Sequence, residues 1–538
     1  DLVSEGEIEG FATASKEGRT KGTTAYNNAA LKDVFLNDTP VLRASADSTN
    51  PQTTDFNFQD VKFTPRFGTG SQTKIPGIES SVSTTSVGVE VTASTPVTRQ
   101  ITNTNVDAVR VSVTFPQLQR ATNEGDLLGA EVQLKISVQY NSGGFTDVIT
   151  DTIRGRSGDA YQKDYRVAIT GSFPVDIRVS RVTADATETN LQDTFQWTSF
   201  GEIIDDASRY LDSAYSSIRL DSMQFSAIPR RKFRIRGIKV RIPGAGASSS
   251  GTPEVVTSQA DADRLGLGTV SSFGFIHYPD GYIFNGVMGA AVWTTCPAMI
   301  LLDILTNERY GFGDHITDSS LDLFSFVAAS KFANTLVKDG FDADEPRFSC
   351  NVNIQSPQEA FDLINSLSGV MRCMPIWSAG TITITQDKPA DASYLFNLAN
   401  VTEEGFSYSG SSLKARHSVI SVAYFNMDSQ EIDYEVVGDS DSAEDTARKN
   451  KFGVVVKQVK AFACTSRGQA QRLGKAILFA EQNESEVVAF STSIDSGVVV
   501  RPGAIIEIND PVRAGVRRGG RLSAVASTTV VTVDDTEA

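Results

Sequence analysis

Alternation of apolar and polar residues is the commonest pattern in the first half of the chain. It is clearest in VRVSVTF (109–115), AEVQLKISVQY (130–140), FPVDIRVSRVT (173–183) and KFRIRGIKVRI (232–242). A strand with one buried and one solvated face has this period of two, because successive side chains point to opposite faces. The pattern predicts one or more antiparallel β domains between about residues 60 and 225.

Helical periodicity is confined to a few stretches, at 294–313, 356–371 and 466–484. In the second stretch, Ser356 and Glu359 have the spacing of a capping box, and Pro357 falls in the first turn. The buried face of this helix is predicted to comprise the apolar residues Ala360, Phe361, Ile364, Leu367 and Met371.

The third helix repeats this design, with Ser466 and Gln469 as its capping box. Its predicted apolar stripe is Ala470, Leu473, Ile477 and Leu478, and the residues predicted to lie outside it are Arg467, Gln471, Arg472 and Lys475. Helices next to strand-like runs predict α+β units in the last third of the chain. The run PGAGASSSGTP (243–253) has the composition of a flexible loop.

Cysteine and methionine cluster in MRCMPIWSAGTITITQDKP (371–389). The turn SAG (378–380) predicts a hairpin between residues 372–377 and 381–385, with Met371, Cys373, Pro375 and Trp377 on one face. There is no C-x-x-C motif and no histidine nearby, so we expect core packing rather than a metal or redox site. The remaining cysteines, 296, 350 and 464, are predicted to be buried thiols rather than a disulfide framework.

The chain has 538 residues and a formal net charge of −16. This length is too great for one core and predicts roughly three to five domains. The charge argues against a protein that binds nucleic acid, although not against a surface that DNA passes without binding. Because the sequence begins at Asp1 and ends soon after a strand-like run, we expect it to be part of a longer chain.

Motifs of catalysis are absent from the sequence. The three histidines, His277, His315 and His417, do not form a paired arrangement, and there is no G-x-S-x-G elbow. The acidic run 339–347 could hold a hard cation but lacks the EF-hand spacing, so a solvated loop is favoured. The run 437–449 is predicted to be an exposed acidic loop leading into a helix. We therefore expect no enzyme activity, no cofactor and no metal site.

Basic residues concentrate in RRKFRIRGIKVR (230–241), where Lys232, Arg234 and Arg236 alternate with Phe233 and Ile235. This predicts one cationic and one apolar strand face. The cationic face is expected to be solvated or to contact an acidic neighbour. Direct contact with nucleic acid is the less favoured alternative.

Several stretches together give the chain a recognisable family resemblance. They are DLVSEGEIEGF (1–11), VFLNDTPV (34–41), TPVTRQI (95–101), TFQWTSFGEIID (194–205), DSMQFSAIPRRKFRIRGIKVRIP (221–243), LTNERYGFGDH (305–315), EPRFSCNVNIQSPQEAFDLINSLSGVMRCMPIWSAGTITITQDKP (345–389), LKARHSVISVAYFN (413–426), FACTSRGQAQRLG (462–474) and VRPGAIIEIND (500–510). These stretches occur in the same order as in the host-specificity protein J family, which the chain therefore resembles. The family comprises the tip attachment or central-fibre proteins of phages with long, flexible, non-contractile tails such as lambda. Glu7 and Glu308 stand where the family often has proline.

The resemblance implies a fold that is mainly β with α+β units, divided into several domains. It comprises tail-tube-like β-barrel hub domains and additional antiparallel β-sandwich domains. The implied boundaries are 1–58 and 225–290 for the first hub domain, 59–224 for inserted antiparallel β domains, 291–395 for an α+β hub domain and 396–538 for a second barrel-like hub domain. A fibre region would follow the last of these.

The resemblance also implies a structural function at the distal tip of a phage tail. Such proteins form a homotrimeric hub that closes the tail tube and links it to the central fibre, with roles in host recognition and DNA ejection. Expected partners are the distal tail and tail-tip proteins, the tape measure protein, a host cell-surface receptor reached through the fibre, and viral DNA that passes through the channel without specific binding. The virion would be assembled in the host cytoplasm. A subunit or neighbour interface is expected at Arg230, Arg231, Lys232, Arg234 and Arg236.

Two other classes of function stay open at this point. A tail-associated glycan or peptidoglycan hydrolase would need paired carboxylates across a cleft, and sequence alone does not reveal such a pair. A carbohydrate-binding adhesin would present exposed aromatic side chains on loops. The structural hub is favoured over both.

Overall fold

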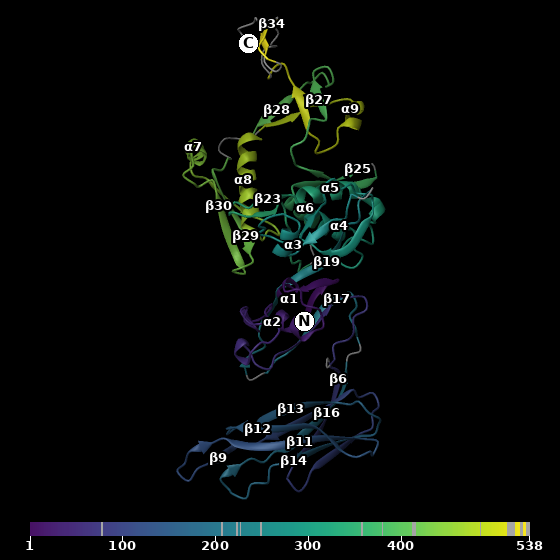
Figure 1. Cartoon of the computed structure of the whole chain (residues 1–538), viewed down its shortest axis with the longest axis vertical. Coiled ribbons are helices and arrows are strands. Elements are labelled where there is room, and N and C mark those ends of the chain that lie inside the picture. The colour runs from purple at the N-terminus through teal and green to yellow at the C-terminus, as the bar shows by residue number, and fades with distance from the viewer. Residues whose placement is uncertain are drawn as a thin grey trace. The chain divides into compact units, whose positions relative to one another are not determined.

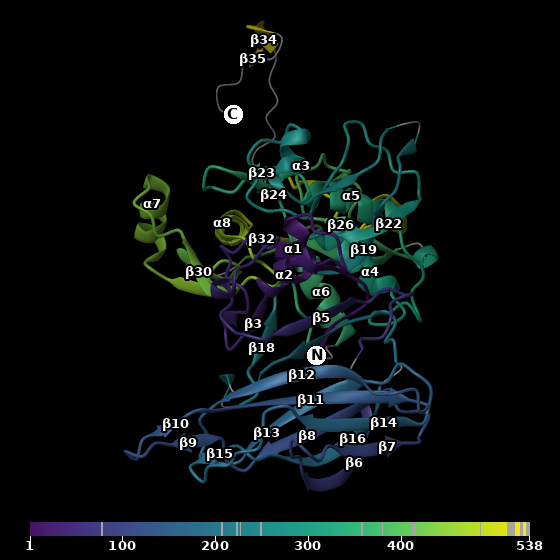
Figure 2. The same cartoon turned by 60° about the horizontal axis from the view of Figure 1, so that its bottom comes forward.

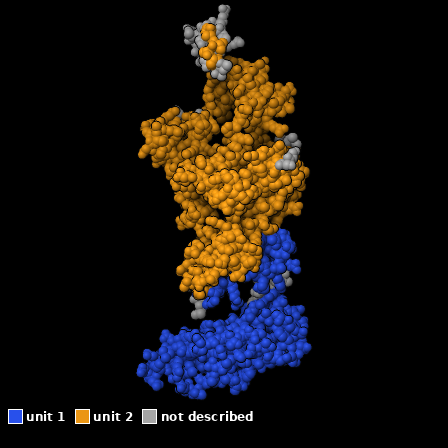
Figure 3. All heavy atoms as spheres, in the orientation of Figure 1, with its two compact units in different colours: residues 1–3, 60–226 blue, residues 4–59, 227–538 orange. Residues whose placement is uncertain are grey.

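The computed structural model describes residues 1–76, 79–205, 208–221, 224–225, 227–247, 250–356, 359–378, 380–410, 416–484, 486–513, 522–527 and 531–533. These residues divide into two compact units, which Figure 3 colours separately. Unit 1 comprises residues 1–3 and 60–226, and unit 2 comprises residues 4–59 and 227–538. The sequence-based boundaries for the inserted β domains were 59–224, and the finer division of the rest of the chain stays a prediction.

Unit 1 is a β-sandwich of two four-stranded antiparallel sheets (Figure 1, Figure 2). One sheet has the order β12 (Thr146–Gly155), β11 (Ala130–Tyr140), β14 (Val175–Arg181) and β7 (Val97–Ile101). The other has the order β13 (Tyr161–Ala168), β8 (Ala108–Phe115), β16 (Gln196–Asp205) and β6 (Glu79–Glu90). Two smaller sheets are β10 (Leu127–Leu128), β9 (Gln119–Ala121) and β15 (Leu191–Gln192), and β1 (Leu2–Glu5), β17 (Ser213–Arg219) and β5 (Lys62–Phe67).

The core of the sandwich follows from the alternation in its strands. Along β14, every second residue from Val175 to Arg181 is buried, and Val132, Leu134, Ile136 and Val138 of β11 lie in the same core. Aromatic side chains from the second sheet and its flanks close this core, with Phe115, Phe195 and Trp197 at most 1% exposed. The period of two therefore identified β8, β11 and β14 and their buried faces correctly.

Unit 2 begins with short strands and helices that surround the basic run. These are β2 (Ile8–Phe11), α1 (Ala12–Lys16), α2 (Thr24–Leu31), β3 (Val34–Leu36), β4 (Thr39–Pro40) and the 3₁₀ helix Thr53–Asp55. After the insertion follow β18 (Arg231–Phe233), β19 (Ile235–Pro243), β20 (Glu254–Val256), α3 (Gln259–Arg264), β21 (Phe275–His277) and β22 (Met288–Trp293). The sheets have the orders β18–β3–β4, β2–β19–β22 and β20–β21.

The middle of unit 2 packs helices against hairpins. Its elements are α4 (Pro297–Thr306), the 3₁₀ helix Asp318–Ser320, α5 (Leu323–Ala333), β23 (Leu336–Lys338), β24 (Asp344–Pro346), α6 (Ala360–Val370), β25 (Cys373–Ser378) and β26 (Thr381–Gln386). One core joins α4, α5, α6 and the β25–β26 hairpin. The hairpin was predicted from its turn, and the structure confirms it, with Trp377 opposite Ile382.

The C-terminal part of unit 2 contains a long helix and several small sheets. Its elements are β27 (Tyr394–Asn397), β28 (Ser407–Gly410), β29 (Val419–Asn426), β30 (Glu431–Val437), α7 (Ala443–Phe452), β31 (Val456–Lys460), α8 (Arg467–Asn483), β32 (Glu486–Ala489), α9 (Ile494–Val499), β33 (Ile506–Asn509), β34 (Leu522–Val525) and β35 (Val531–Val533). The sheet order β30–β29–β31 places the antiparallel β30 and the parallel β31 on either side of β29.

The structure is mostly β with few helices, as predicted, and it contains an antiparallel sandwich. The described sheets are open and have two to four strands, so the tail-tube-like barrel stays a prediction. Within the described residues, no helix is long and apolar enough to cross a membrane.

Two sequence predictions about local structure are wrong. The run 232–242 forms two strands rather than one, because the backbone N–H of Arg234 donates to the carbonyl of Asp33 and the chain then changes partner from β3 to β2. Helix α6 begins at Ala360 with Glu359 as its N-cap and no side-chain cap, so Ser356 does not start it. Pro357 lies outside the described residues.

The buried face of α6 also differs from the prediction. Leu363, Leu367 and Met371 are buried, whereas the side chain of Phe361 is 74% exposed. In the hairpin that follows, Trp377 is 69% exposed although it was expected to pack in the core. Both aromatics lie at positions that the neighbouring elements do not cover.

Candidate interaction site

The predicted interface residues lie on and around β18 and β19, next to two aspartates of the same chain. Arg230 forms an ion pair of 3.2 Å with Asp38, and the ammonium group of Lys232 also pairs with Asp38. Asp38 follows β3, which pairs with β18 in the sheet. The guanidinium of Arg231 donates to the carbonyl of Pro229.

Arg234 reaches an aspartate that is fully buried. Its guanidinium lies 2.7 Å from the carboxylate of Asp33, which also accepts hydrogen bonds from the backbone N–H and the hydroxyl of Thr13. Burial raises the pKa of Asp33, and the hydrogen bonds from Thr13 and the charge of Arg234 oppose that shift. Arg234 therefore balances a buried charge within its own subunit.

Arg236 is also held inside unit 2. Its guanidinium stacks on the ring of Trp293 at 4.6 Å from the ring centroid and donates to the carbonyl of Thr257 at 3.0 Å. The acidic neighbours expected for this run therefore include residues of the chain itself. Arg230, whose side chain is 80% exposed, remains the best placed of the five to reach another molecule.

The acidic run 339–347 was expected to be a solvated loop, and the structure overturns this expectation at two residues. Asp339 is 6% and Glu345 is 2% exposed. The Asp339 carboxylate accepts hydrogen bonds from the backbone N–H groups of Phe341 and Ala343, and Asp344 pairs with Lys338. The physical reason is that the run folds into the β23–β24 hairpin, which packs against the start of α8. Among the described residues, no group of three acidic, histidine or cysteine side chains could hold a metal ion.

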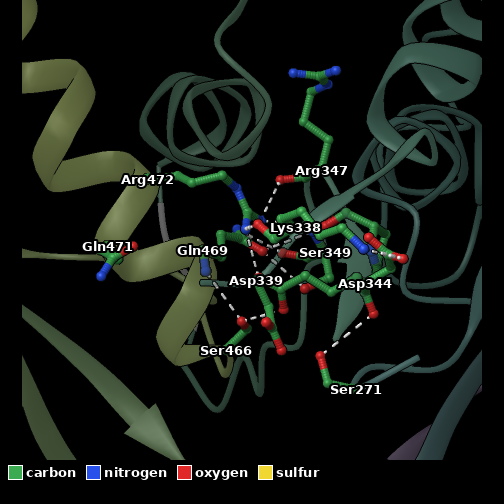
Figure 4. A network of polar contacts seen from close by, with 12 residues as sticks. Ser271, Lys338, Asp339, Asp344, Arg347, Ser349, Ser466, Gln469, Gln471 and Arg472 are labelled. Atoms are coloured by element: carbon green, nitrogen blue, oxygen red, sulfur yellow. Dashed lines mark hydrogen bonds and ion pairs between the residues drawn. The ribbon is translucent and has the colours of Figure 1, made fainter. Parts of the chain in front are cut away.

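Glu345 takes part in a polar network that joins β24 to α8. Figure 4 shows its partners Ser466 and Arg472 on the helix. Its carboxylate accepts a hydrogen bond of 2.6 Å from Arg472 and another from the hydroxyl of Ser466. Arg472 also donates to the backbone carbonyl of Arg347 at 3.0 Å. Arg472 lies outside the apolar stripe of α8, as predicted, whereas its partner Glu345 was not predicted.

A glutamine makes a second connection at the same place. The amide oxygen of Gln469 accepts from the backbone N–H and the hydroxyl of Ser349, both at 2.9 Å, and its amide nitrogen donates to the Ser349 carbonyl at 3.1 Å. Ser466 does cap α8, because its hydroxyl accepts from the backbone N–H of Gln469. The other half of the predicted capping box is wrong, since the Gln469 side chain binds Ser349 instead of reaching back to Ser466.

The absence of a side chain at Gly468 allows the close approach of α8 and the β23–β24 hairpin. A Cβ atom on this residue would lie 2.3 Å from the Glu345 carboxylate and 2.5 Å from the Asp339 carbonyl oxygen. No sequence pattern signalled this contact. It depends on a segment more than a hundred residues away in the chain.

The four cysteines are free thiols, as expected from their scattered positions. Cys296, Cys350 and Cys464 are buried, and Cys373 is half-buried. Burial raises the pKa of Cys350 and of Cys373 to about 12, so both stay protonated at neutral pH. Cys373 thus has the inert environment expected for a packing residue.

A stretch of unit 1 and a stretch of unit 2 that begins just before α6 each match a known family. The model described as "Tip attachment protein J, FNIII-A domain" matches residues 81–206, which lie in the sandwich. The model described as "Putative phage tail protein" matches residues 359–525, which include α8.

Two curated proteins are similar over most of the chain. Tip attachment protein J of Escherichia phage SECphi27 is 27% identical over 482 residues, which are 89% of this chain and 37% of that protein. Tip attachment protein J of Escherichia phage SECphi4 is 28% identical over 540 residues, covering 99% of this chain and 42% of that protein. The resemblance to the protein J family is confirmed.

The protein J-like chain thus spans about two fifths of the length of these curated relatives. The relatives bear the name of an attachment protein and not of an enzyme, in agreement with the lack of catalytic motifs in the sequence. A solved structure titled "CBM4 structure and function" covers 36% of this chain at 10% identity with a TM-score of 0.11, which supports no conclusion about fold or ligand.

Proposed function

We propose that this chain is a structural component of a phage tail tip, where it forms the hub that closes the tail tube and links it to the host-attachment fibre. The observation that carries the proposal is the similarity to two tip attachment proteins, which extends over 89% and 99% of the chain. A match to a family of phage tail proteins at residues 359–525 supports association with other tail components. The chain's place is then the distal end of the virion tail, after assembly in the host cytoplasm.

The proposed assembly is a homotrimer around a channel, built on tail-tube-like hub domains. Distal tail proteins, other tail-tip proteins and the tape measure protein would contact it. A central fibre would connect this hub to the host cell-surface receptor. The exposed guanidinium of Arg230 and the neighbouring Arg231 are the proposed contact of β18 with another subunit or tail protein.

The negative net charge of the chain is compatible with a channel through which DNA is ejected. The formal net charge is −16 per chain, so three copies would together carry three times that charge. A negative wall repels phosphate groups and disfavours binding of DNA during its passage. DNA is therefore a transient occupant in this proposal and not a ligand.

Immunogold electron microscopy of virions tests the location directly. Antibodies against the purified chain should label the distal tail tip, whereas antibodies against a capsid protein should label only the head. Labelling of the head alone, or of no virion structure, would contradict the proposal. A cryo-electron microscopy map of the same tips should then contain three copies around the channel.

Two activity assays separate this function from the alternatives. The purified chain should leave the turbidity of a cell-wall suspension unchanged, and it should bind no glycan on an array. Hydrolysis of the cell wall would favour the tail-associated hydrolase, and glycan binding would favour the adhesin. A muralytic enzyme at the same concentration serves as the positive control of the first assay.

A further inference from the structure

Three basic side chains gather around a pair of phenylalanine rings in the middle of unit 2. The guanidinium of Arg347 lies over the ring of Phe332, 4.4 Å from the ring centroid, and the ammonium group of Lys388 lies over the same ring at 5.6 Å. The ring of Phe348 packs on that of Phe332 with 6.3 Å between the centroids, and the guanidinium of Arg372 lies over it at 5.9 Å. Arg347, Arg372 and Lys388 are called the basic cluster below.

The basic cluster lacks a negative partner within the part of the chain that the structure describes. None of its three members forms an ion pair there, whereas the nearby Arg472 is paired with Glu345. The Nε atom of Arg347 is buried without a hydrogen-bond partner, and Figure 4 shows this side chain turned away from the polar contacts of Arg472. The guanidinium of Arg372 donates to the backbone carbonyl of Arg472 at 3.5 Å, which leaves its charge unpaired.

Burial and like charges both act against the two guanidiniums of the cluster. Burial lowers the pKa of Arg347, and the charges of Arg472 and Arg372 lower it further. Burial also lowers the pKa of Arg372, and the charges of Asp387 and Glu484 only partly oppose this effect. Because arginine stays protonated in proteins, an anion from another molecule is what would relieve the repulsion.

The backbone at Arg372 supports a role for its side chain. The residue follows Met371, the C-cap of α6, and its φ of 52° lies in the left-handed region. Glycine is the usual residue at this position after a helix, because a side chain is disfavoured in that conformation. An arginine held there indicates that the contacts of its side chain matter.

A hollow beside α8 shows which kind of anion fits. Arg372 and Lys388 line this hollow, whose volume of about 1140 Å³ lies above the usual range for a small-molecule site. Acidic residues line it as well, namely Asp387, Asp439, Glu444, Asp445 and Glu484. Its apolar lining residues include Leu473, Ile477, Phe479 and Ile505. The acidic residues would repel a polyanion such as nucleic acid, whereas a protein segment with one carboxylate and apolar neighbours matches the lining.

We propose that the basic cluster binds the carboxylate of an aspartate or glutamate side chain on a segment of another protein of the tail. Arg347 and Arg372 hold the carboxylate, because guanidinium groups donate paired hydrogen bonds to it. The exposed Lys388 lies at the rim of the site. The two phenylalanine rings keep water from the contact, which strengthens the attraction between the charges. The inference rests on the proposed function for the source of the segment, and on the described residues for the chemistry that the segment must carry.

Carbodiimide treatment of isolated phage tails tests the proposal, because the reagent joins an amine directly to a carboxylate in contact with it. Mass spectrometry should find Lys388 linked through an amide bond to an aspartate or glutamate of another chain. Arg347→Met should lower the yield of this product by about tenfold, and Lys62→Met, at an exposed position of β5, is the matched control and should leave it unchanged. Tails that contain the chain but lack the product overturn the binding site and leave the proposed function standing. Tails that lack the chain overturn both.

Arg372→Gly separates binding from folding. Glycine suits the left-handed backbone, so the purified variant should melt no lower than the wild type in circular dichroism, while the yield of the Lys388 product falls. A lower melting temperature with an unchanged yield would show that Arg372 serves the fold, and the proposed site would be wrong. Binding of a single-stranded oligonucleotide to the purified wild-type chain, lost in Arg347→Met, would identify nucleic acid as the ligand and would also overturn the proposal.

Discussion

The guanidinium of Arg472 donates a hydrogen bond of 2.6 Å to the carboxylate of Glu345, whose side chain is 3% exposed. The two residues come from α8 and β24, which are separated by more than a hundred positions in the sequence. Because the carboxylate is buried away from water, its negative charge is stabilised by the guanidinium of Arg472 and by the hydroxyl of Ser466. The pair therefore fixes the start of α8 on the middle part of unit 2.

We expect Arg472→Met to lower the free energy of unfolding of unit 2 by about 3 kcal/mol, because it leaves the Glu345 charge buried and unpaired. The double variant Arg472→Met/Glu345→Leu should recover much of this loss, since both charges are then gone. Denaturant unfolding of the full chain, followed by hydrogen exchange at the amides of α8, measures the effect. A single variant as stable as the wild type would show that the pair contributes nothing.

Gly468→Ala should destabilise the same contact by about 1–3 kcal/mol, because the added Cβ would collide with the Glu345 carboxylate and the Asp339 carbonyl. The control is Gly369→Ala in α6, where a Cβ would meet nothing within 4 Å. In that exposed helical position alanine should be neutral or stabilising by up to about 1 kcal/mol. Equal melting temperatures for the two variants would refute the argument from close approach.

Arg230→Glu should reduce incorporation of the chain into phage tails while leaving its melting temperature unchanged, because the Arg230 side chain is 80% exposed. Arg234→Glu is expected to lower the melting temperature as well, since it places a second negative charge beside the buried Asp33. Lys62→Glu, at an exposed position of β5, is the control for charge reversal alone. Normal tail assembly with Arg230→Glu would exclude Arg230 from the interface.

The stability of α8 should depend on pH through Glu481. Burial raises the pKa of Glu481, but hydrogen bonds from His417 and Lys457 outweigh burial and hold the pKa below its ordinary value. A lowered folded-state pKa contributes stability that is present above the unfolded-state pKa of about 4.3 and is lost as the pH falls through the folded-state value. The difference in melting temperature between the wild type and Glu481→Gln should therefore be larger at pH 7 than at pH 3. If the difference in melting temperature were the same at pH 7 and pH 3, the expected direction of the pH dependence would be contradicted.

Local patterns in the sequence predicted several elements of the fold. The alternation in 130–140 predicted β11 with its bounds, and the turn at 378–380 predicted the β25–β26 hairpin. Ser466 was identified as an N-cap because capping depends on residues only three positions apart. The basic run was found by composition, but its partners Asp38 and Asp33 lie 192 and 201 residues earlier in the chain, and no local signal connects them to it.

The sequence by itself determined several of the strands and helices, such as β11 and α8, and the period of their apolar positions, because both properties repeat over a few residues. Only the tertiary structure decided what those faces meet. Gln469 fits a capping box by its spacing, yet its amide binds Ser349, which lies 120 residues away. Phe361 and Trp377 fit a core by their period, yet both are exposed. Period records the side to which a residue points, whereas burial depends on whether a distant segment, or another subunit, covers that side.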